Sequence, residues 1–283
     1  MTKEEIIKPE NLVYKKPTLM NDNAMHYCPG CSHGVVHKLI AEVIEEMGME
    51  DKTVGISPVG CAVFAYNYLD IDWQEAAHGR APAVATAVKR LWPDRLVFTY
   101  QGDGDLACIG TAETIHALNR GENITIIFIN NAIYGMTGGQ ASPTTPEGAF
   151  AATAPYGSID PTFDICKLAA GAGATYVARA TVANPVMCEQ ILKKAIEHQK
   201  KGFALVEIIS FCHTQFGRKN KRSRPTDNIK FLKEHTVLKA QADKMTPEEL
   251  EGKIVVGEFV NIENAREYTD RYNDVIARAQ GKA

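Results

Sequence analysis

The chain of 283 residues is predicted to adopt an α/β fold with a mostly parallel sheet covered by helices on both faces. Three observations predict this fold class. Strand-like and helix-like segments alternate along the chain, the strands are continuous apolar runs, and the helices carry apolar residues at helical spacing. Hydrophobic residues make up 45% of the chain and charged residues 23%, which excludes a largely disordered protein.

The elements follow from local patterns taken in chain order. A helix over 35–47 carries apolar residues at every third or fourth position and ends before Gly48, a residue type that commonly ends helices. A helix over 82–91 begins with a proline, which the first helical turn tolerates. The segments 95–100 and 124–129 are mostly apolar, as in strands buried on both faces. The remaining predicted elements are strands over 53–56, 175–177 and 204–209 and helices over 106–118, 165–170, 185–199 and 262–279.

Charge and hydropathy exclude several function classes. Lys and Arg total 31 against 34 Asp and Glu, and this balance predicts no binding to nucleic acid or to a membrane. No apolar run reaches the roughly 18 residues of a membrane span, and the charged N-terminus lacks a secretory signal, so a cytoplasmic location is expected. The basic run 218–224 is interpreted as a solvated loop, with a contact to an acidic partner or to cofactor phosphates as the alternative.

Polar residues follow two neighbouring strands of the predicted sheet. The first strand runs into Gly102-Asp103-Gly104-Asp105 and the next ends at Asn130-Asn131. The glycine pattern also fits a dinucleotide site, but such a site expects an acidic residue where this chain has asparagine. Mg²⁺ prefers oxygen ligands and commonly bridges carboxylates to phosphates, so Asp103, Asn131 and a following backbone carbonyl predict a magnesium–diphosphate site. This GDG–NN arrangement resembles the signature of thiamine-diphosphate enzymes.

Seven cysteines in a chain expected to be cytoplasmic indicate metal ligation or redox chemistry rather than disulfides. Cys28-Pro-Gly-Cys31 is a tight C-x-x-C turn, and Cys61 and Cys212 are single candidates. A thioredoxin-like dithiol is disfavoured because no strand precedes Cys28. The spacing alone leaves a zinc site and an iron–sulfur cluster equally open. The thiols predicted to be buried and inert are Cys108, Cys166 and Cys188.

Five motifs in the chain carry a more specific resemblance. They are Cys-Pro-Gly-Cys at 28–31, Pro-Val-Gly-Cys at 58–61, His-Gly-Arg at 78–80, Gly-Asp-Gly-Asp at 102–105, and Asn-Asn-Ala-Ile-Tyr-Gly-Met-Thr-Gly-Gly-Gln at 130–140 followed by Ser-Pro-Thr-Thr. In this order they resemble the β subunit of 2-oxoacid:ferredoxin oxidoreductases of the 2-oxoisovalerate or 2-oxoglutarate type, over about residues 26–222. Ser32 departs from the family, which usually has glycine after the second cysteine.

The resemblance implies a three-layer thiamine-diphosphate-binding fold and a set of site residues. We expect an N-terminal extension over 1–24, a cofactor-binding domain over 25–217 and a C-terminal extension with a terminal helix over 218–283. The implied ligands of a [4Fe–4S] cluster are Cys28, Cys31, Cys61 and Cys212, and those of Mg²⁺ are Asp103, Asn131 and the backbone carbonyl of Ile133. The implied contacts of thiamine diphosphate are Val59, Gly60, Cys61, Ala62, His78, Gly104, Asp105, Gly135 and Met136, with His78 also implied as catalytic.

The implied activity is a reversible, coenzyme A-dependent oxidative decarboxylation of a 2-oxoacid, with electrons passing through the cluster to ferredoxin. It requires an α subunit that supplies the pyrimidine-binding domain and the activating carboxylate, and it leaves room for γ and ferredoxin-like δ subunits. The apolar Met136 favours a branched-chain substrate such as 2-oxoisovalerate, with 2-oxoglutarate as the alternative. Two other functions stay open: a non-catalytic electron-transfer subunit with a degenerate cofactor fold, and a non-redox thiamine-dependent lyase or synthase.

Overall fold

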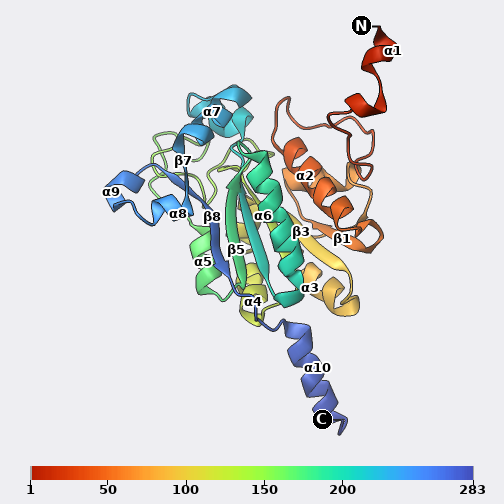
Figure 1. Cartoon of the computed structure of the whole chain (residues 1–283). Helices are drawn as coiled ribbons and strands as arrows, with labels where there is room; N and C mark the ends of the chain where they lie inside the picture. The colour runs from red at the N-terminus through yellow and green to blue at the C-terminus, as the bar shows by residue number, and fades with distance from the viewer. Residues whose placement is uncertain (1, 283) are drawn as a thin grey trace.

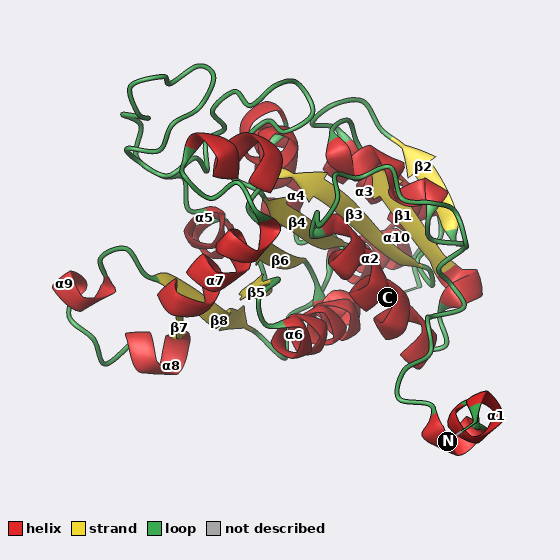
Figure 2. Cartoon of the chain, turned by 90° about the horizontal axis from the view of Figure 1, so that it is seen from above, coloured by secondary structure: helices red, strands yellow, loops and turns green. Residues whose placement is uncertain are grey.

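The computed structural model describes residues 2–282, which form an eight-stranded sheet with the strand order β2-β1-β3-β4-β6-β5-β8-β7 (Figures 1 and 2). β1 to β6 pair in parallel, whereas β8 runs antiparallel to β5 and carries β7 at the edge. The strands are β1 (Thr53–Ser57), β2 (Asp72–Glu75), β3 (Leu96–Gly102), β4 (Thr125–Asn130), β5 (Tyr176–Thr181), β6 (Ala204–Ile209), β7 (Thr236–Leu238) and β8 (Ile254–Asn261).

Helices connect the parallel strands, as the alternating pattern predicts. They are α1 (Lys3–Ile6), α2 (His33–Glu46), α3 (Ala81–Leu91), α4 (Thr111–Arg120), α5 (Ile165–Gly171), α6 (Pro185–His198), α7 (Pro225–His235), α8 (Lys239–Ala242), α9 (Pro247–Leu250) and α10 (Tyr268–Ala279). The single helix predicted over 106–118 is wrong, because a π-helical turn at Gly104–Ile109 precedes α4. None of the helices in the described part of the chain is long and apolar enough to cross a bilayer.

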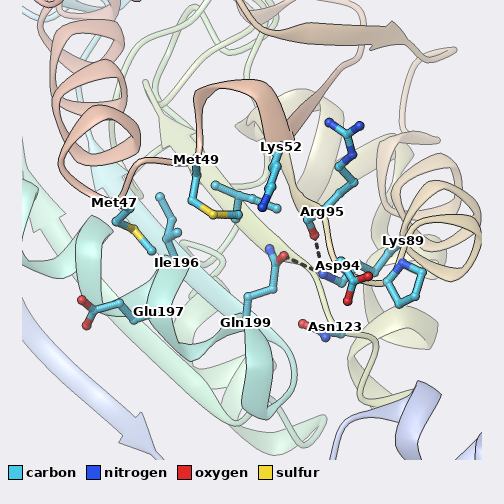
Figure 3. Close-up of a pocket in the computed structure, with 12 residues that line it drawn as sticks. Met47, Met49, Lys52, Lys89, Asp94, Arg95, Asn123, Ile196, Glu197 and Gln199 are labelled. Atoms are coloured by element: carbon cyan, nitrogen blue, oxygen red, sulfur yellow. Dashed lines mark hydrogen bonds between the residues drawn. The ribbon is translucent and has the colours of Figure 1, made fainter.

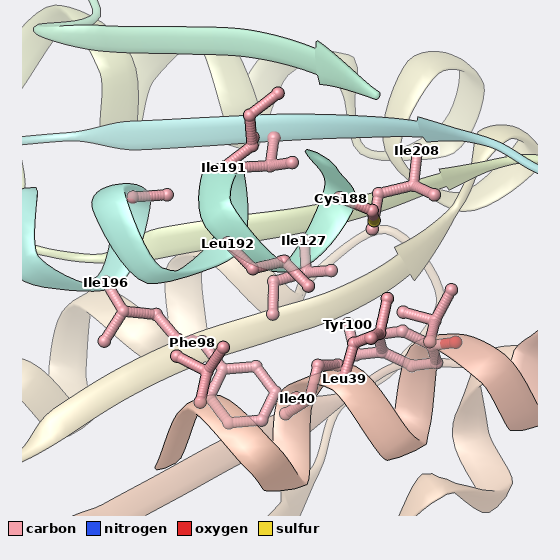
Figure 4. Packing of buried hydrophobic residues seen from close by; sticks show 14 of the residues in the cluster. Leu39, Ile40, Phe98, Tyr100, Ile127, Cys188, Ile191, Leu192, Ile196 and Ile208 are labelled. Carbon is pink, nitrogen blue, oxygen red and sulfur yellow. The ribbon is translucent and has the colours of Figure 1, made fainter. Parts of the chain in front are cut away.

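Two apolar clusters separate the three layers of the fold. Phe98 and Tyr100 of β3 point into the cluster under α2 and α6, whereas Val97 belongs to the cluster under α3, α4 and α5. Figure 4 shows the first cluster, in which Leu39 and Ile40 of α2 and side chains of α6 pack against β3. Successive strand residues point to opposite faces, so an apolar strand contributes side chains to both clusters. The predicted α/β class with helices on both faces is confirmed.

The C-terminal segment differs from expectation. The terminal helix starts at Tyr268 rather than near Ile262, and the residues before it form β8, which pairs with β5 in the main sheet. The sequence pattern does not predict a strand here because Gly257 and Glu258 interrupt the apolar residues of β8, of which only Val256 is buried. No residue of α10 is buried, and the helix projects away from the body in Figure 1. The division into 1–24, 25–217 and 218–283 stays a prediction.

The N-terminal segment is exposed along most of its length but becomes attached at Leu19. The Leu19 side chain is buried, and its backbone N–H donates to Glu45 Oε1 at 2.6 Å. Met20 pairs with Leu69 in an isolated bridge. Nearer the C-x-x-C turn, the backbone N–H of His26 donates to the Tyr68 hydroxyl at 3.0 Å.

Candidate functional site

The sequence-predicted site residues converge on the carboxyl edge of the parallel sheet. The loops after β1, β3, β4 and β6 carry the residues around Cys61, Asp103, Asn131 and Cys212, and these strands are neighbours in the sheet. Parallel strands place all their carboxyl ends on one edge, which is where α/β folds bind ligands. The convergence is therefore a consequence of strand order.

Asp103 is an almost fully buried carboxylate at the tip of β3, with 1% of its surface exposed. Its Oδ2 accepts hydrogen bonds from the hydroxyls of Ser142 and of Thr144, the latter at 2.9 Å. Burial raises the pKa of Asp103 to about 6, although these donors and the backbone N–H of Asn131 lower it. A buried carboxylate with only neutral donors is unfavourable, and a divalent cation at this position would relieve that cost. The residues present fit Mg²⁺.

The turn after β4 is held in a strained conformation. Ala132 has φ of 64°, in the left-handed region that non-glycine residues rarely occupy. The side chain of Asn131 accepts a hydrogen bond from the backbone N–H of Ile133 at 3.2 Å. Strain of this kind persists where the surroundings enforce it and is concentrated at functional sites. The three predicted magnesium ligands thus come from β3 and from the adjoining turn.

Asp105 and His78 form a hydrogen-bonded pair beside this turn. His78 Nδ1 lies 2.5 Å from Asp105 Oδ1, which also accepts from the Gly79 N–H at 2.6 Å. Asp105 Oδ2 accepts from Gln101 at 2.7 Å, so both carboxylate oxygens are engaged. Burial raises the pKa of Asp105, while Gln101, Gly79 and His78 lower it. The carboxylate orients the His78 ring, which is 31% exposed and accessible to a ligand.

Gly104 allows a close approach that no side chain would permit. A Cβ at this position would lie 2.1 Å from the Tyr134 ring, whose hydroxyl donates to the Gly104 carbonyl at 3.1 Å. The ring therefore covers the start of the π-helical turn Gly104–Ile109. Such turns are frequent at functional sites. A second π-helical turn, His213–Gly217, directly follows Cys212.

Cys28, Cys31, Cys61 and Cys212 line one cavity of about 250 Å³, together with Gly135 and Met136. Burial raises the pKa of Cys31 to about 11 and that of Cys61 to about 12, and Cys28 and Cys212 add to both shifts. Four thiolates this close repel one another, whereas a bound metal centre deprotonates its ligands and removes the repulsion. The set fits a metal centre.

The cysteine cavity adjoins the turn that carries Asn131. The backbone N–H of Cys212 donates to the Asn131 carbonyl at 3.1 Å, and the charge of Asp103 contributes to the raised pKa of Cys61. Tyr27 donates to the Cys61 carbonyl at 3.0 Å, and the Gln215 N–H donates to the Cys212 sulfur at 3.4 Å. Hydrogen bonds to ligand sulfurs are one of the means by which proteins adjust cluster potentials.

Sequence reasoning missed several contributors to the site and misplaced others. Ser142 and Thr144 hold Asp103, although the Ser-Pro-Thr-Thr run was noted only as part of a motif. Cys166 and Cys188 are buried as predicted, but Cys108 is exposed, because the helix expected to bury it is a π-helical turn. The solvated-loop interpretation of 218–224 is wrong for Arg222, whose guanidinium lies 3.8 Å from the centre of the Phe231 ring.

A larger cavity, of about 550 Å³, lies at the opposite edge of the sheet, among residues preceding β1, β3, β4 and β6 (Figure 3). In Figure 3 Lys89 and Gln199 meet at its wall, joined by a hydrogen bond of 3.1 Å. None of the predicted site residues lines this cavity. Its volume is therefore no guide to the site at the carboxyl edge.

Comparisons with known proteins agree with this geometry. A family model described as the thiamine pyrophosphate enzyme C-terminal TPP binding domain matches residues 58–208. The 2-oxoglutarate synthase subunit KorB of Methanocaldococcus jannaschii is 46% identical over 257 residues, covering 90% of this chain and 94% of that protein. The ketoisovalerate oxidoreductase subunit VorA of Methanothermobacter thermautotrophicus is 44% identical over 83% of this chain and 50% of its own length.

A solved structure is similar over nearly the whole chain. It is the 2-oxoglutarate:ferredoxin oxidoreductase of Magnetococcus marinus with 2-oxoglutarate, coenzyme A and succinyl-CoA bound. Its TM-score is 0.81 at 28% sequence identity, covering 96% of this chain and 92% of that one. The similarity therefore extends beyond the TPP-binding segment 58–208.

Proposed function

Because this chain belongs to the β subunits of the 2-oxoacid:ferredoxin oxidoreductases, a family of thiamine-diphosphate enzymes, we propose that it binds thiamine diphosphate, Mg²⁺ and a [4Fe–4S] cluster within residues 25–217. The observation that carries the proposal is the buried Asp103 carboxylate beside Asn131, adjoining the cavity lined by four cysteines. The similar proteins that are named as oxidoreductases argue against the electron-transfer and lyase alternatives.

Thiamine diphosphate would bind through its Mg²⁺ and through loops at the carboxyl edge. Asp103, Asn131 and the Ile133 carbonyl would hold the ion. The Asp105–His78 pair supplies an oriented imidazole beside the same loop. The further cofactor contacts that we propose are Val59, Gly60, Cys61, Ala62, Gly104, Gly135 and Met136.

The spacing of the cysteine sulfurs favours a cluster over zinc. Sulfur ligands of a tetrahedral zinc ion lie about 3.8 Å apart, given Zn–S bonds of about 2.3 Å. Among the described residues, no three of Cys28, Cys31, Cys61 and Cys212 have sulfurs within 4.8 Å of one another, although all four line one cavity. Wider spacing suits a cluster that carries one cysteine on each iron. Iron, acid-labile sulfide and thiamine-diphosphate contents of the purified complex test both cofactors.

When bound, thiamine diphosphate supplies the carbon chemistry that removes CO₂ from a 2-oxoacid. This chain's residues hold the diphosphate end and connect the cofactor loop to the cluster through Cys61, which belongs to both. A short path of this kind suits transfer of single electrons to ferredoxin. Coenzyme A would accept the acyl group, and an α subunit would contribute the pyrimidine-binding domain, with γ and ferredoxin-like δ subunits as further partners.

The purified chain without its α subunit is expected to show no 2-oxoacid-dependent reduction of ferredoxin or viologen. The reason is that, by the family resemblance, the carboxylate that activates the aminopyrimidine comes from the α subunit. Mixing the chain with separately purified α subunit should restore activity. Full turnover by the chain alone would refute the need for a partner.

Two substrate classes have support within this site. Met136 lines the cysteine cavity and is 48% exposed, an apolar surface that suits the branched chain of 2-oxoisovalerate. 2-Oxoglutarate is favoured by Lys219, whose ammonium lies 2.8 Å from where a Cβ on Gly139 would stand. The Lys219 ammonium donates to the neutral Gln215 side chain at 3.1 Å, and Gln215 lines the same cavity. A distal carboxylate could pair with this cation.

If 2-oxoglutarate is the substrate, Lys219→Met should raise its KM by about 10- to 100-fold, as expected for loss of a charged hydrogen bond. The KM for 2-oxoisovalerate should stay unchanged, because that substrate has no distal carboxylate. Lys221→Met is the matched control, since it removes an exposed cation from the same basic run. Equal KM changes for both substrates would exclude this role for Lys219. A higher wild-type kcat/KM for 2-oxoisovalerate would support the branched-chain assignment.

A further inference from the structure

A buried ion pair lies behind the turn that carries the proposed magnesium ligands. Glu207 of β6 is 1% exposed, and its Oε2 accepts from Arg179 Nε at 2.6 Å. Arg179 also donates to Asp164 at 2.7 Å. Asp164, Cys166 and Glu207 are close enough to resemble a metal site, but the Arg179 guanidinium already pairs with both carboxylates. The buried Glu207–Arg179 ion pair therefore has a role other than metal binding.

The second oxygen of Glu207 fixes the orientation of the Asn130 side-chain amide on the neighbouring strand. Glu207 Oε1 accepts from Asn130 Nδ2 at 2.7 Å. A carboxylate can only accept, so it fixes which end of the Asn130 amide faces it. Asn130 Oδ1 must therefore face the other way, where it accepts from the Ala132 N–H at 3.1 Å.

Both backbone groups of the strained Ala132 are thus held by side chains. Asn130 binds its N–H, and the Thr145 hydroxyl donates to its carbonyl at 2.7 Å. Thr145 belongs to the same loop as the two hydroxyls that hold Asp103. Without these contacts, the left-handed conformation would cost about 1–3 kcal/mol and the turn would relax.

We propose that Glu207 is a positioning residue that, through Asn130, sets the Asn131–Ile133 turn for magnesium binding. This inference rests on the proposed function of that turn. The ion pair with Arg179 holds the Glu207 carboxylate in position, and the Glu207–Asn130 hydrogen bond fixes the Asn130 side chain across the β4–β6 pairing. The carboxylate itself contacts neither metal nor substrate. Its removal should therefore weaken cofactor binding more than it weakens the fold.

The test compares Glu207→Gln with Glu122→Gln in the assembled αβ complex. Glu122 is a matched control because it is 2% exposed and paired with Arg90 and Arg120, without contact to the turn. Titrating Mg²⁺ at saturating thiamine diphosphate, with calorimetry as the readout, should show about 10- to 100-fold weaker Mg²⁺ binding in Glu207→Gln only. Unchanged binding in Glu207→Gln, or equal weakening in both variants, would overturn the inference.

A second variant tests whether the effect passes through Asn130. Asn130→Ala keeps the Glu207–Arg179 ion pair and should weaken Mg²⁺ binding to a similar extent. The double variant should then bind Mg²⁺ no more weakly than either single variant, because both substitutions remove the same chain of hydrogen bonds from Glu207 through Asn130 to Ala132. Additive effects would contradict this path. Failure of the wild-type complex to bind Mg²⁺ with thiamine diphosphate would instead refute the proposed function itself.

Discussion

Asp103→Asn is expected to weaken Mg²⁺-dependent binding of thiamine diphosphate by at least about 10²-fold and to abolish turnover. The substitution removes the one carboxylate among the three proposed ligands and keeps the side-chain shape. Ser142 and Thr144 can still donate to the amide oxygen, so the local hydrogen bonds survive. Loss of binding would therefore report on charge rather than on a collapsed loop.

The same substitution should stabilise the metal-free chain. Burial holds the pKa of Asp103 at about 6, above its ordinary value of 3.8. Between these values the folded chain keeps a proton that the unfolded chain has released, so the free energy of unfolding falls as pH rises through this window. The loss is nearly complete at about pH 7, one unit above the folded pKa, and is on the order of 3 kcal/mol. The asparagine in Asp103→Asn cannot titrate, so this variant should not show the pH-dependent loss in the free energy of unfolding.

Thermal unfolding in EDTA at pH 5 and pH 7.5 measures this effect, and calorimetric titration with thiamine diphosphate and Mg²⁺ measures the binding. Glu122→Gln again serves as the control, because its carboxylate is compensated by two arginines. The assignment of Asp103 fails if the asparagine variant binds the cofactor within threefold of wild type. A less stable metal-free variant would contradict the argument from burial.

Cys212→Ser is expected to lose the brown absorbance of the cluster or to leave a cluster that oxygen rapidly destroys. Cys212 lies at the end of β6 and lines the cavity with the other three cysteines. A serine hydroxyl is a poor iron ligand beside three thiolates, since soft sulfur ligands favour such clusters. Electron transfer to ferredoxin should fall by orders of magnitude, while thiamine-diphosphate content should change little.

Cys108→Ser is the control for this experiment, because Cys108 is exposed and lies outside the cysteine cavity. Iron and sulfide should be measured per chain after anaerobic purification and again after exposure to air. Four irons retained by Cys212→Ser under both conditions would remove Cys212 from the ligand set. Loss of iron in Cys108→Ser would show that the loss is not specific to the cavity.

The sequence predicts a site residue where a residue type suited to metal binding stands at the end of a predicted strand. Asp103 and Asn131 stand at the tips of apolar strands, and parallel pairing brings such tips to one edge. Ser142 and Thr144 carried no comparable signal, because hydroxyl residues in a loop become partners of a carboxylate only after the loop folds back. The exposure of Cys108 also followed from an unrecognised feature, the π-helical turn that replaces an ordinary helix.

The amino-acid sequence alone indicates the alternation of buried strands and helices, the sheet edge at which the proposed site lies, and the family. The folded structure was needed to show that Glu207, far along the chain, accepts a hydrogen bond from Asn130, which in turn accepts one from the Ala132 N–H, and that β8 joins the sheet. Apolar periodicity and local motifs are properties of adjacent residues, so a sequence displays them directly. Hydrogen bonds between distant strands depend on register and side-chain orientation, which are defined only when the sheet has formed.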